Sequence, residues 1–314
     1  MLCCAVKFKI DFDIPKNILP STWPSFFAMG SCFADTQAES LAKSGFKVYS
    51  NPFGIIYNPI SIATILYRLV NDKKYTNDDF IERGLYFSLE HHGSKKYENI
   101  NEAVAKSNFF LEEAKYILEQ CSVVVLTFGT SVVYHHIQTK KIAANNHKLP
   151  TKEFEILPLK YSSTLNSISN CIKAVREVND KAQIICTVSP IRHLRTGVIE
   201  NARSKAFLLT ALHEAMEQNT NISYFPSFEI FMDELRDYRF AKEDMMHPTK
   251  IAQDYIFQRF KETYFNFNTL NIIDQVDQWQ KFANHRPLAS VDDHNELVDE
   301  KKKALATKYP FLHL

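Results

Sequence analysis

The chain has 314 residues, and its 37 Lys and Arg nearly balance its 36 Asp and Glu, which gives a formal net charge of +1 at pH 7. This balance offers no electrostatic basis for nucleic-acid binding, and the length suffices for one sizeable buried core. No run approaches the roughly 18 apolar residues of a membrane span, and the first residues lack the pattern of a secretory signal. We therefore expect a cytoplasmic protein with neither a membrane nor a nucleic acid as partner.

Apolar segments that resemble strands alternate with helical patterns along the chain. Strands are expected at 25–29, 48–50, 122–128, 183–188 and 222–225, and helices at 164–178 and 201–216. Continuous apolar strands between helices are typical of a parallel sheet that is covered on both faces. The sequence therefore predicts an α/β fold in which polar residues after the strands meet at one edge of the sheet.

The last fifty residues differ from this pattern. Ile272, Ile273, Val276, Trp279 and Phe282 recur at helical spacing, and a charged run follows at 299–303. We expect a domain over 1–264 and a helical extension over 265–314 that packs on the same domain. Nothing in the sequence predicts an oligomeric state.

A glycine-led turn joins the first expected strand to a helix that begins at about Cys32. Gly30 allows a sharp turn, and Ser31 and Cys32 then lie at the positive end of the helix, where a thiolate and an oxyanion are both stabilised. Gly45 is placed where a helix end favours a left-handed residue. A plain turn with an N-capping serine is the alternative interpretation.

The segment from Asp244 to His247 places a carboxylate and an imidazole three residues apart, directly before Pro248 and a second amphipathic helix. Proline is favoured at a first helical position, so His247 is expected at the mouth of that helix. The carboxylate could fix the imidazole tautomer and stabilise its protonated form. A surface Asp that caps the helix beside an idle His remains an alternative.

Eight motifs in chain order resemble the GSCFA-domain proteins, which are grouped with the SGNH or GDSL-like hydrolases. The motifs cover most of the chain, and they are 27–35 (FAMGSCFAD), 51–59 (NPFGIIYNP), 128–130 (FGT), 147–150 (HKLP), 189–193 (SPIRH), 204–206 (SKA), 233–240 (DELRDYRF) and 244–247 (DMMH). The resemblance implies a flavodoxin-like three-layer α/β/α sandwich with a five-stranded parallel sheet, here with appended C-terminal helices. It also implies ester hydrolysis by a nucleophile-His-Asp mechanism.

The resemblance leaves the nucleophile open between two residues. The nucleophile of the related Gly-Asp-Ser block follows the glycine by two residues, and a gapless overlay puts Cys32 at that position. A shifted turn would make Ser31 the nucleophile instead. We favour Cys32, with His247 as base and Asp244 as its partner.

The resemblance further implies an oxyanion hole with an amide after the second strand, which Gly54 fits, and an asparagine after the third. No asparagine follows the third strand in register, so a hydroxyl of Thr130 or Ser131 is expected to replace it, or Asn58 or Asn146 to reach in from a loop. The residues expected to contact the substrate are Asn58, Arg192, His193 and His92.

These observations predict a hydrolase that cleaves an acyl ester, most plausibly on a small molecule or carbohydrate. Acyl transfer at the same site and a non-catalytic protein that kept the fold are the alternatives. The six cysteines, at 3, 4, 32, 121, 171 and 186, show no paired spacing, and His135 and His136 lack a metal-ligand pattern, so we expect no metal and no cofactor.

Overall fold

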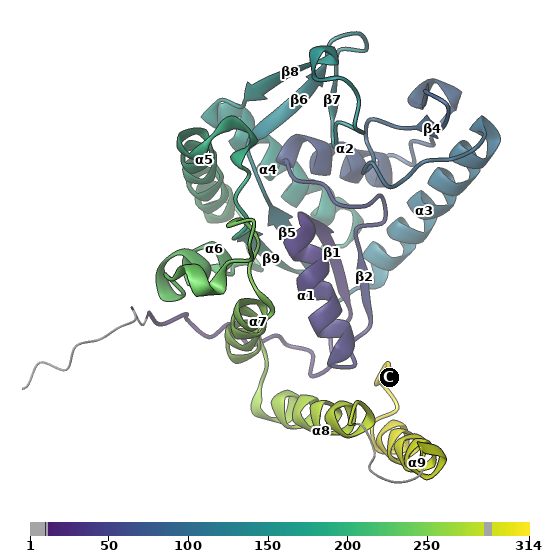
Figure 1. Ribbon diagram of the computed structural model, residues 1–314, viewed down its shortest axis with the longest axis vertical. Helices are drawn as coiled ribbons and strands as arrows, with labels where there is room; N and C mark the ends of the chain where they lie inside the picture. The colour runs from purple at the N-terminus through teal and green to yellow at the C-terminus, as the bar shows by residue number, and fades with distance from the viewer. Residues whose placement is uncertain (1–9, 11, 286–290) are drawn as a thin grey trace, which may run out of the picture.

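The computed structural model describes residues 10, 12–285 and 291–314, so Cys3 and Cys4 lie outside the described residues. A five-stranded sheet forms its centre (Figure 1). All of its neighbouring strands pair in parallel. The strand order is β10 (Ile222–Tyr224), β9 (Gln183–Val188), β5 (Val123–Phe128), β1 (Phe26–Gly30) and β2 (Val48–Ser50). The expected parallel sheet is confirmed, and each strand lies within one residue of its predicted range at either end.

Helices cover both faces of the sheet. Successive strand residues point to opposite sides, so each strand supplies apolar side chains to both faces. Phe27 and Met29 of β1 belong to one apolar cluster, and Phe26 and Ala28 belong to the other. The first cluster packs against α2 (Pro59–Val70), α3 (Ile100–Gln120), α4 (Tyr161–Val178) and α5 (Val198–Glu217). The second packs against α1 (Cys32–Lys43), the segment that begins with α6 (Ser227–Glu229), and α7 (Lys250–Tyr264). The result is the expected three-layer α/β/α sandwich.

The sequence did not predict a small antiparallel sheet that follows β5. Its order is β7 (Lys141–Ala143), β6 (Val132–His136) and β8 (Phe154–Pro158), and a two-stranded ribbon of β3 (Ile81–Glu82) and β4 (Tyr86–Phe87) precedes α3. Figure 1 shows β6, β7 and β8 at one end of the molecule, above the central sheet. This insertion supplies one wall of the pocket described below.

The C-terminal extension forms α8 (Phe267–Ala283) and α9 (Val291–Lys308), which lie at the other end of the molecule (Figure 1). The chain after α9 returns to the end of α1, where the His313 amide donates to the Gly45 carbonyl at 2.9 Å. Trp23 stacks on Phe46 there and contacts Phe311. The appended helices are confirmed, whereas the division of the chain between residues 264 and 265 stays a prediction.

The sequence predicted the end of one helix and the start of another near the site. α1 ends at Lys43, and Gly45 follows with φ +89°, as the sequence predicts. Pro248, in contrast, is not the first residue of α7. Thr249 caps that helix by accepting the Ala252 amide, and Lys250 is its first residue. The prediction for Pro248 was therefore wrong by two residues, because the threonine hydroxyl supplies the cap.

Candidate active site

The glycine-led turn between β1 and α1 lies at the carboxyl end of β1, against β5. Gly30 has φ +144°, and a Cβ there would lie 2.1 Å from the Thr127 carbonyl oxygen. Ser31 is fully buried, its amide donates to the Thr127 carbonyl at 3.1 Å, and its Oγ accepts the Phe33 amide at 3.3 Å. Ser31 thus serves as the N-cap of α1. Cys32, the first residue of the helix, is half-buried and lines a pocket.

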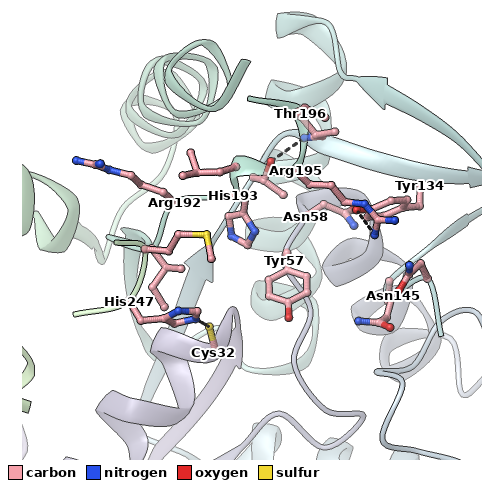
Figure 2. Close-up of a pocket in the computed structure, with 17 residues that line it drawn as sticks. Cys32, Tyr57, Asn58, Tyr134, Asn145, Arg192, His193, Arg195, Thr196 and His247 are labelled. Carbon is pink, nitrogen blue, oxygen red and sulfur yellow. Dashed lines mark hydrogen bonds between the residues drawn. The ribbon is translucent and has the colours of Figure 1, made fainter. Parts of the chain in front are cut away.

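Cys32, His247 and Asp244 form a continuous array across 215 residues of sequence, and Figure 2 shows the Cys32 and His247 part of it. Cys32 Sγ lies 3.9 Å from His247 Nε2, and His247 Nδ1 lies 2.6 Å from Asp244 Oδ2. Asp244 Oδ1 accepts the amides of Met246 at 2.8 Å and His247 at 2.9 Å. The carboxylate is therefore fixed by the loop that carries the imidazole, and the structure brings Cys32 rather than Ser31 to that imidazole.

The surroundings shift the pKa values at the two ends of this array in opposite directions. Burial raises the pKa of the Cys32 thiol above its ordinary value, although the Cys32 and Phe33 amides at the helix end oppose the increase. The His247 and Met246 amides lower the pKa of Asp244 to about 2. Asp244 is thus ionised at neutral pH, whereas Cys32 is a protonated thiol that needs a base.

The side chain of Asn51, which the sequence did not identify as a site residue, supports the turn between β1 and α1. Asn51 Oδ1 accepts the Gly30 amide at 2.8 Å, and Asn51 Nδ2 donates to Asp35 Oδ1 at 2.7 Å. Asn51 has φ +41°, a conformation that asparagine tolerates better than most residues. The side chain therefore ties this turn to α1 and to the end of β2.

A pocket of about 590 Å³ opens beside Cys32 and His247 (Figure 2). Five further residues that the sequence named for the site line it, and these are Asn58, Thr130, Asn146, Arg192 and His193. The sequence missed other lining residues, including Tyr57, Tyr134, Asn145 and Arg195. Tyr57 lies within the 51–59 motif, and Tyr134 lies on β6. Asn145 and Arg195 lie in connecting segments beside the 147–150 and 189–193 motifs, and only these positions could have indicated a role.

Three predicted site residues lie away from this pocket, and their contacts explain why. The Gly54 amide already donates to the Asn51 carbonyl at 2.8 Å, so the predicted role as an oxyanion donor is not supported. Ser131 is buried, and its Oγ donates to the Ser204 carbonyl at 3.5 Å. His92 Nδ1 contacts Ser94 Oγ at 2.9 Å within its own loop. Local backbone turns therefore use groups that the sequence assigned to the substrate.

A buried lysine lies beneath the pocket. Lys205 of α5 is 2% exposed, and its Nζ donates to the carbonyls of Gly129 at 2.7 Å and Ser189 at 2.6 Å, just beyond β5 and β9. Burial lowers its pKa to about 7. His193 is close by, since a Cβ on Gly129 would lie 2.9 Å from His193 Nε2, and burial lowers the pKa of His193 to about 3. His193 is therefore neutral at pH 7.

Within the described part of the chain, no group of three or more His, Cys, Asp or Glu side chains is placed to hold a metal ion. In the same residues no helix is long and apolar enough to cross a membrane. Cys121, Cys171 and Cys186 are buried free thiols, as their apolar surroundings predict.

These features define an α/β/α sandwich protein with a Cys-His-Asp array at the carboxyl edge of its parallel sheet. Residues 25–260 match the model of the GSCFA family, and the chain belongs to that family. A search of curated protein sequences found no relative of this chain.

Three solved structures are similar at a distance. A Clostridium thermocellum family 3 carbohydrate esterase has 10% identity and a TM-score of 0.37, over 80% of this chain and 97% of that one. A carbohydrate esterase family 3 protein from Talaromyces cellulolyticus has 12% identity and a TM-score of 0.29, over 50% and 62%. An acetyl xylan esterase from Butyrivibrio proteoclasticus has 11% identity and a TM-score of 0.39, over 79% and 64%.

Proposed function

We propose that this protein hydrolyses an acyl ester with Cys32 as nucleophile, His247 as general base and acid, and Asp244 as the group that orients His247. The observation that carries the proposal is the 3.9 Å contact between Cys32 Sγ and His247 Nε2, with Asp244 2.6 Å behind the ring. A non-catalytic protein that kept the fold would not need this contact, and a distance above about 6 Å between Cys32 Sγ and His247 Nε2 would favour that alternative. The short distance supports the enzyme.

The chemistry follows from the protonation states. His247 Nε2 takes the thiol proton as Cys32 Sγ attacks the acyl carbonyl, and the imidazolium that forms is stabilised by the ionised Asp244. His247 then gives the proton to the departing alkoxide, which leaves an acyl thioester on Cys32. A water molecule, deprotonated by His247, attacks the thioester, the acid departs, and the thiol regains its proton.

The oxyanion needs donors near Cys32. The Cys32 amide belongs to the first turn of α1, where amides have no intrahelical acceptor and the helix end is positive. Thr130 is the predicted hydroxyl donor that lines the pocket, and the Tyr57 phenol lines it as well. Burial raises the pKa of Tyr57 to about 12, so its hydroxyl keeps its proton at neutral pH. We assign the oxyanion to the Cys32 amide and these two hydroxyls.

For the alcohol of the ester we propose a carbohydrate or a comparable polyol. The aromatic rings of Tyr57 and Tyr134 and the amides of Asn58 and Asn145 line the same pocket. Aromatic faces pack against sugar rings, and a few placed polar groups orient them. The pocket volume of about 590 Å³ accommodates a ligand of this size.

The test is hydrolysis of 4-nitrophenyl acetate by the wild type and by Cys32→Ala, Cys32→Ser, His247→Ala and Ser31→Ala, with intact-mass detection of the acyl-enzyme. We expect Cys32→Ala to lose both activity and adduct, and His247→Ala to lose most of the rate. Ser31→Ala is the matched control, because it removes the neighbouring side chain and a helix cap but keeps the thiol.

Equal, low rates in all five proteins would refute hydrolysis of simple esters. Loss of the adduct in Ser31→Ala but not in Cys32→Ala would assign the nucleophile to Ser31. Glycerol added to the wild-type reaction separates hydrolysis from transfer, since formation of acetylglycerol in place of acetate would show that an alcohol replaces water.

A further inference from the structure

The pocket wall formed by Asn58, Tyr134, Asn145, Asn146 and Arg195, here called the donor wall, presents hydrogen-bond donors in an unusual excess. In each asparagine the side-chain oxygen already accepts a backbone amide. Asn58 Oδ1 accepts from Ser61 at 2.8 Å, Asn145 Oδ1 from His147 at 2.9 Å, and Asn146 Oδ1 from Lys148 at 3.4 Å. These bonds fix the orientation of each amide, so that the nitrogen is the atom turned towards a ligand, although Asn58 Nδ2 uses one of its two hydrogens to donate to Ser61 Oγ at 3.0 Å.

The two remaining members of the donor wall follow the same pattern. Arg195 lies over the Tyr134 ring at 5.3 Å and donates to the Tyr134 hydroxyl at 3.2 Å. The phenol oxygen therefore accepts from Arg195, and its own hydrogen is free to donate elsewhere. The guanidinium retains further N–H groups in a planar fork that matches carboxylate and phosphate geometry.

The charge of the pocket agrees with this pattern. The described residues that line the pocket include Arg192 and Arg195 but no Asp or Glu. No ion pair within the described ranges includes either arginine, and Arg192 contacts the Met232 sulfur instead. Figure 2 shows the Arg192 guanidinium turned away from Arg195, and it lies against the Met232 sulfur. Arg195 therefore faces the pocket without a carboxylate from the described residues to neutralise it.

We propose that the donor wall is a subsite for an anionic group, a carboxylate or a phosphate, carried by the alcohol part of the ester, and that Arg195 is the residue that recognises it. This inference rests on the proposed hydrolysis. Figure 2 shows Cys32 and His247 on one side of the pocket and Arg195, Tyr134 and Asn145 on the other, so one ligand can place its carbonyl at Cys32 and its charge at Arg195.

A neutral sugar would be a poorer fit. Each hydroxyl is a donor as well as an acceptor, and a wall that presents mainly donors pairs the hydroxyl oxygens better than the hydroxyl hydrogens. A carboxylate or phosphate has acceptors only, and its hydrogen bonds with a guanidinium are charge-assisted. The donor wall therefore selects against neutral sugars and for sugars that carry a negative charge.

The test compares three esters that differ only at C6 of the sugar: 3-O-acetylglucose, 3-O-acetylglucuronate and 3-O-acetylglucose 6-phosphate. We expect kcat/KM for at least one anionic ester to exceed that of the neutral ester by about tenfold or more, the range of a charged hydrogen-bonded contact. The ratio should fall towards one in Arg195→Gln and should be partly kept in Arg195→Lys. The matched control is Arg203→Gln, an exposed α5 arginine beside Glu200 and outside the pocket, which should keep the wild-type ratio.

Binding measurements on Cys32→Ala separate this inference from the proposed function. Calorimetry with glucuronate, glucose 6-phosphate and glucose needs no catalysis, and the anionic sugar should bind at least tenfold more tightly than glucose, with loss of the difference in Cys32→Ala/Arg195→Gln. Such binding without ester hydrolysis would sustain the subsite and reject the esterase. Equal or tighter binding of glucose, or a preference for the anion that survives Arg195→Gln, would overturn the subsite. The preferred anion distinguishes carboxylate from phosphate.

Discussion

Substitution of Lys205 by Met tests the buried charge under the pocket. Met has a similar length, but it carries neither charge nor donor. The change leaves the Gly129 and Ser189 carbonyls without the ammonium that now reaches them at 2.7 and 2.6 Å. Each buried acceptor left without a partner costs about 1 to 3 kcal/mol, so we expect a loss of about 2 to 6 kcal/mol where the lysine is neutral.

The same substitution has a pH dependence whose sign follows from the pKa of Lys205. Burial lowers that pKa from 10.5 to about 7, so between these values the unfolded chain binds a proton that the folded chain does not. Stability rises with pH wherever the unfolded state binds more protons, by about 1.4 kcal/mol per pH unit for one group. The wild type should therefore gain about 2 to 3 kcal/mol over Lys205→Met from pH 6.5 to pH 9.

Urea unfolding at pH 6.5 and pH 9 measures this difference directly. Both proteins should carry Cys32→Ala, because the thiol interacts electrostatically with Lys205 and its ionisation in the unfolded chain would add to the pH dependence. Lys173→Met is the matched control, since Lys173 is 75% exposed on α4 and should show no such pH dependence. A destabilisation by Lys205→Met that is equal at both pH values, or larger at pH 6.5, would refute the buried charge.

Three further predictions follow from the site. Gly30→Ala should destabilise the protein by about 3 kcal/mol or more in urea unfolding, since the added Cβ would lie 2.1 Å from the Thr127 carbonyl oxygen. Gly84→Ala is the control, because Gly84 has φ +74° but open space around it, and it should cost about 1 kcal/mol. Similar losses in the two variants would contradict the steric argument. Asp244→Asn should lower kcat for ester hydrolysis by about 10² to 10⁴ with an unchanged Tm, and an unchanged kcat would remove Asp244 from the mechanism. Alkylation of Cys32 by iodoacetamide, followed by peptide mass, should still increase above pH 8, because the thiol pKa is raised; a plateau below pH 7 would indicate a resting thiolate.

The central sheet was predictable because its strands are buried on both faces. A segment such as Val123–Phe128 is apolar at every position but one, and this pattern survives without knowledge of its neighbours. The antiparallel insertion was not predictable in the same way. Lys141–Ala143 has three residues and one polar, exposed end, and β6 ends in two histidines, so neither carries a periodic signal long enough to identify.

The catalytic candidates were predictable as residues, but the choice between Ser31 and Cys32 was not. Both lie at the start of the same helix, and only the backbone decides which side chain faces the pocket. Gly30 at φ +144° directs the Ser31 amide to the Thr127 carbonyl, so that Ser31 caps the helix and the Cys32 side chain faces the pocket. Arg195 and Asn145 were missed because they are brought together by loops whose conformation has no sequence period.

The raised pKa of Cys32 bears on how this site must work. A cysteine at a helix N-terminus is often activated as a resting thiolate, and the sequence suggested the same here. In the structure, burial outweighs the helix amides, so the thiol stays protonated until a base removes the proton. His247 and the ionised Asp244 behind it supply that base, which is the arrangement that a serine nucleophile would also require. Under the proposed mechanism, the site is therefore organised as a serine-type triad with sulfur at the position of attack. Such a site should retain measurable activity as Cys32→Ser, because the proton transfer to His247 is already built into it.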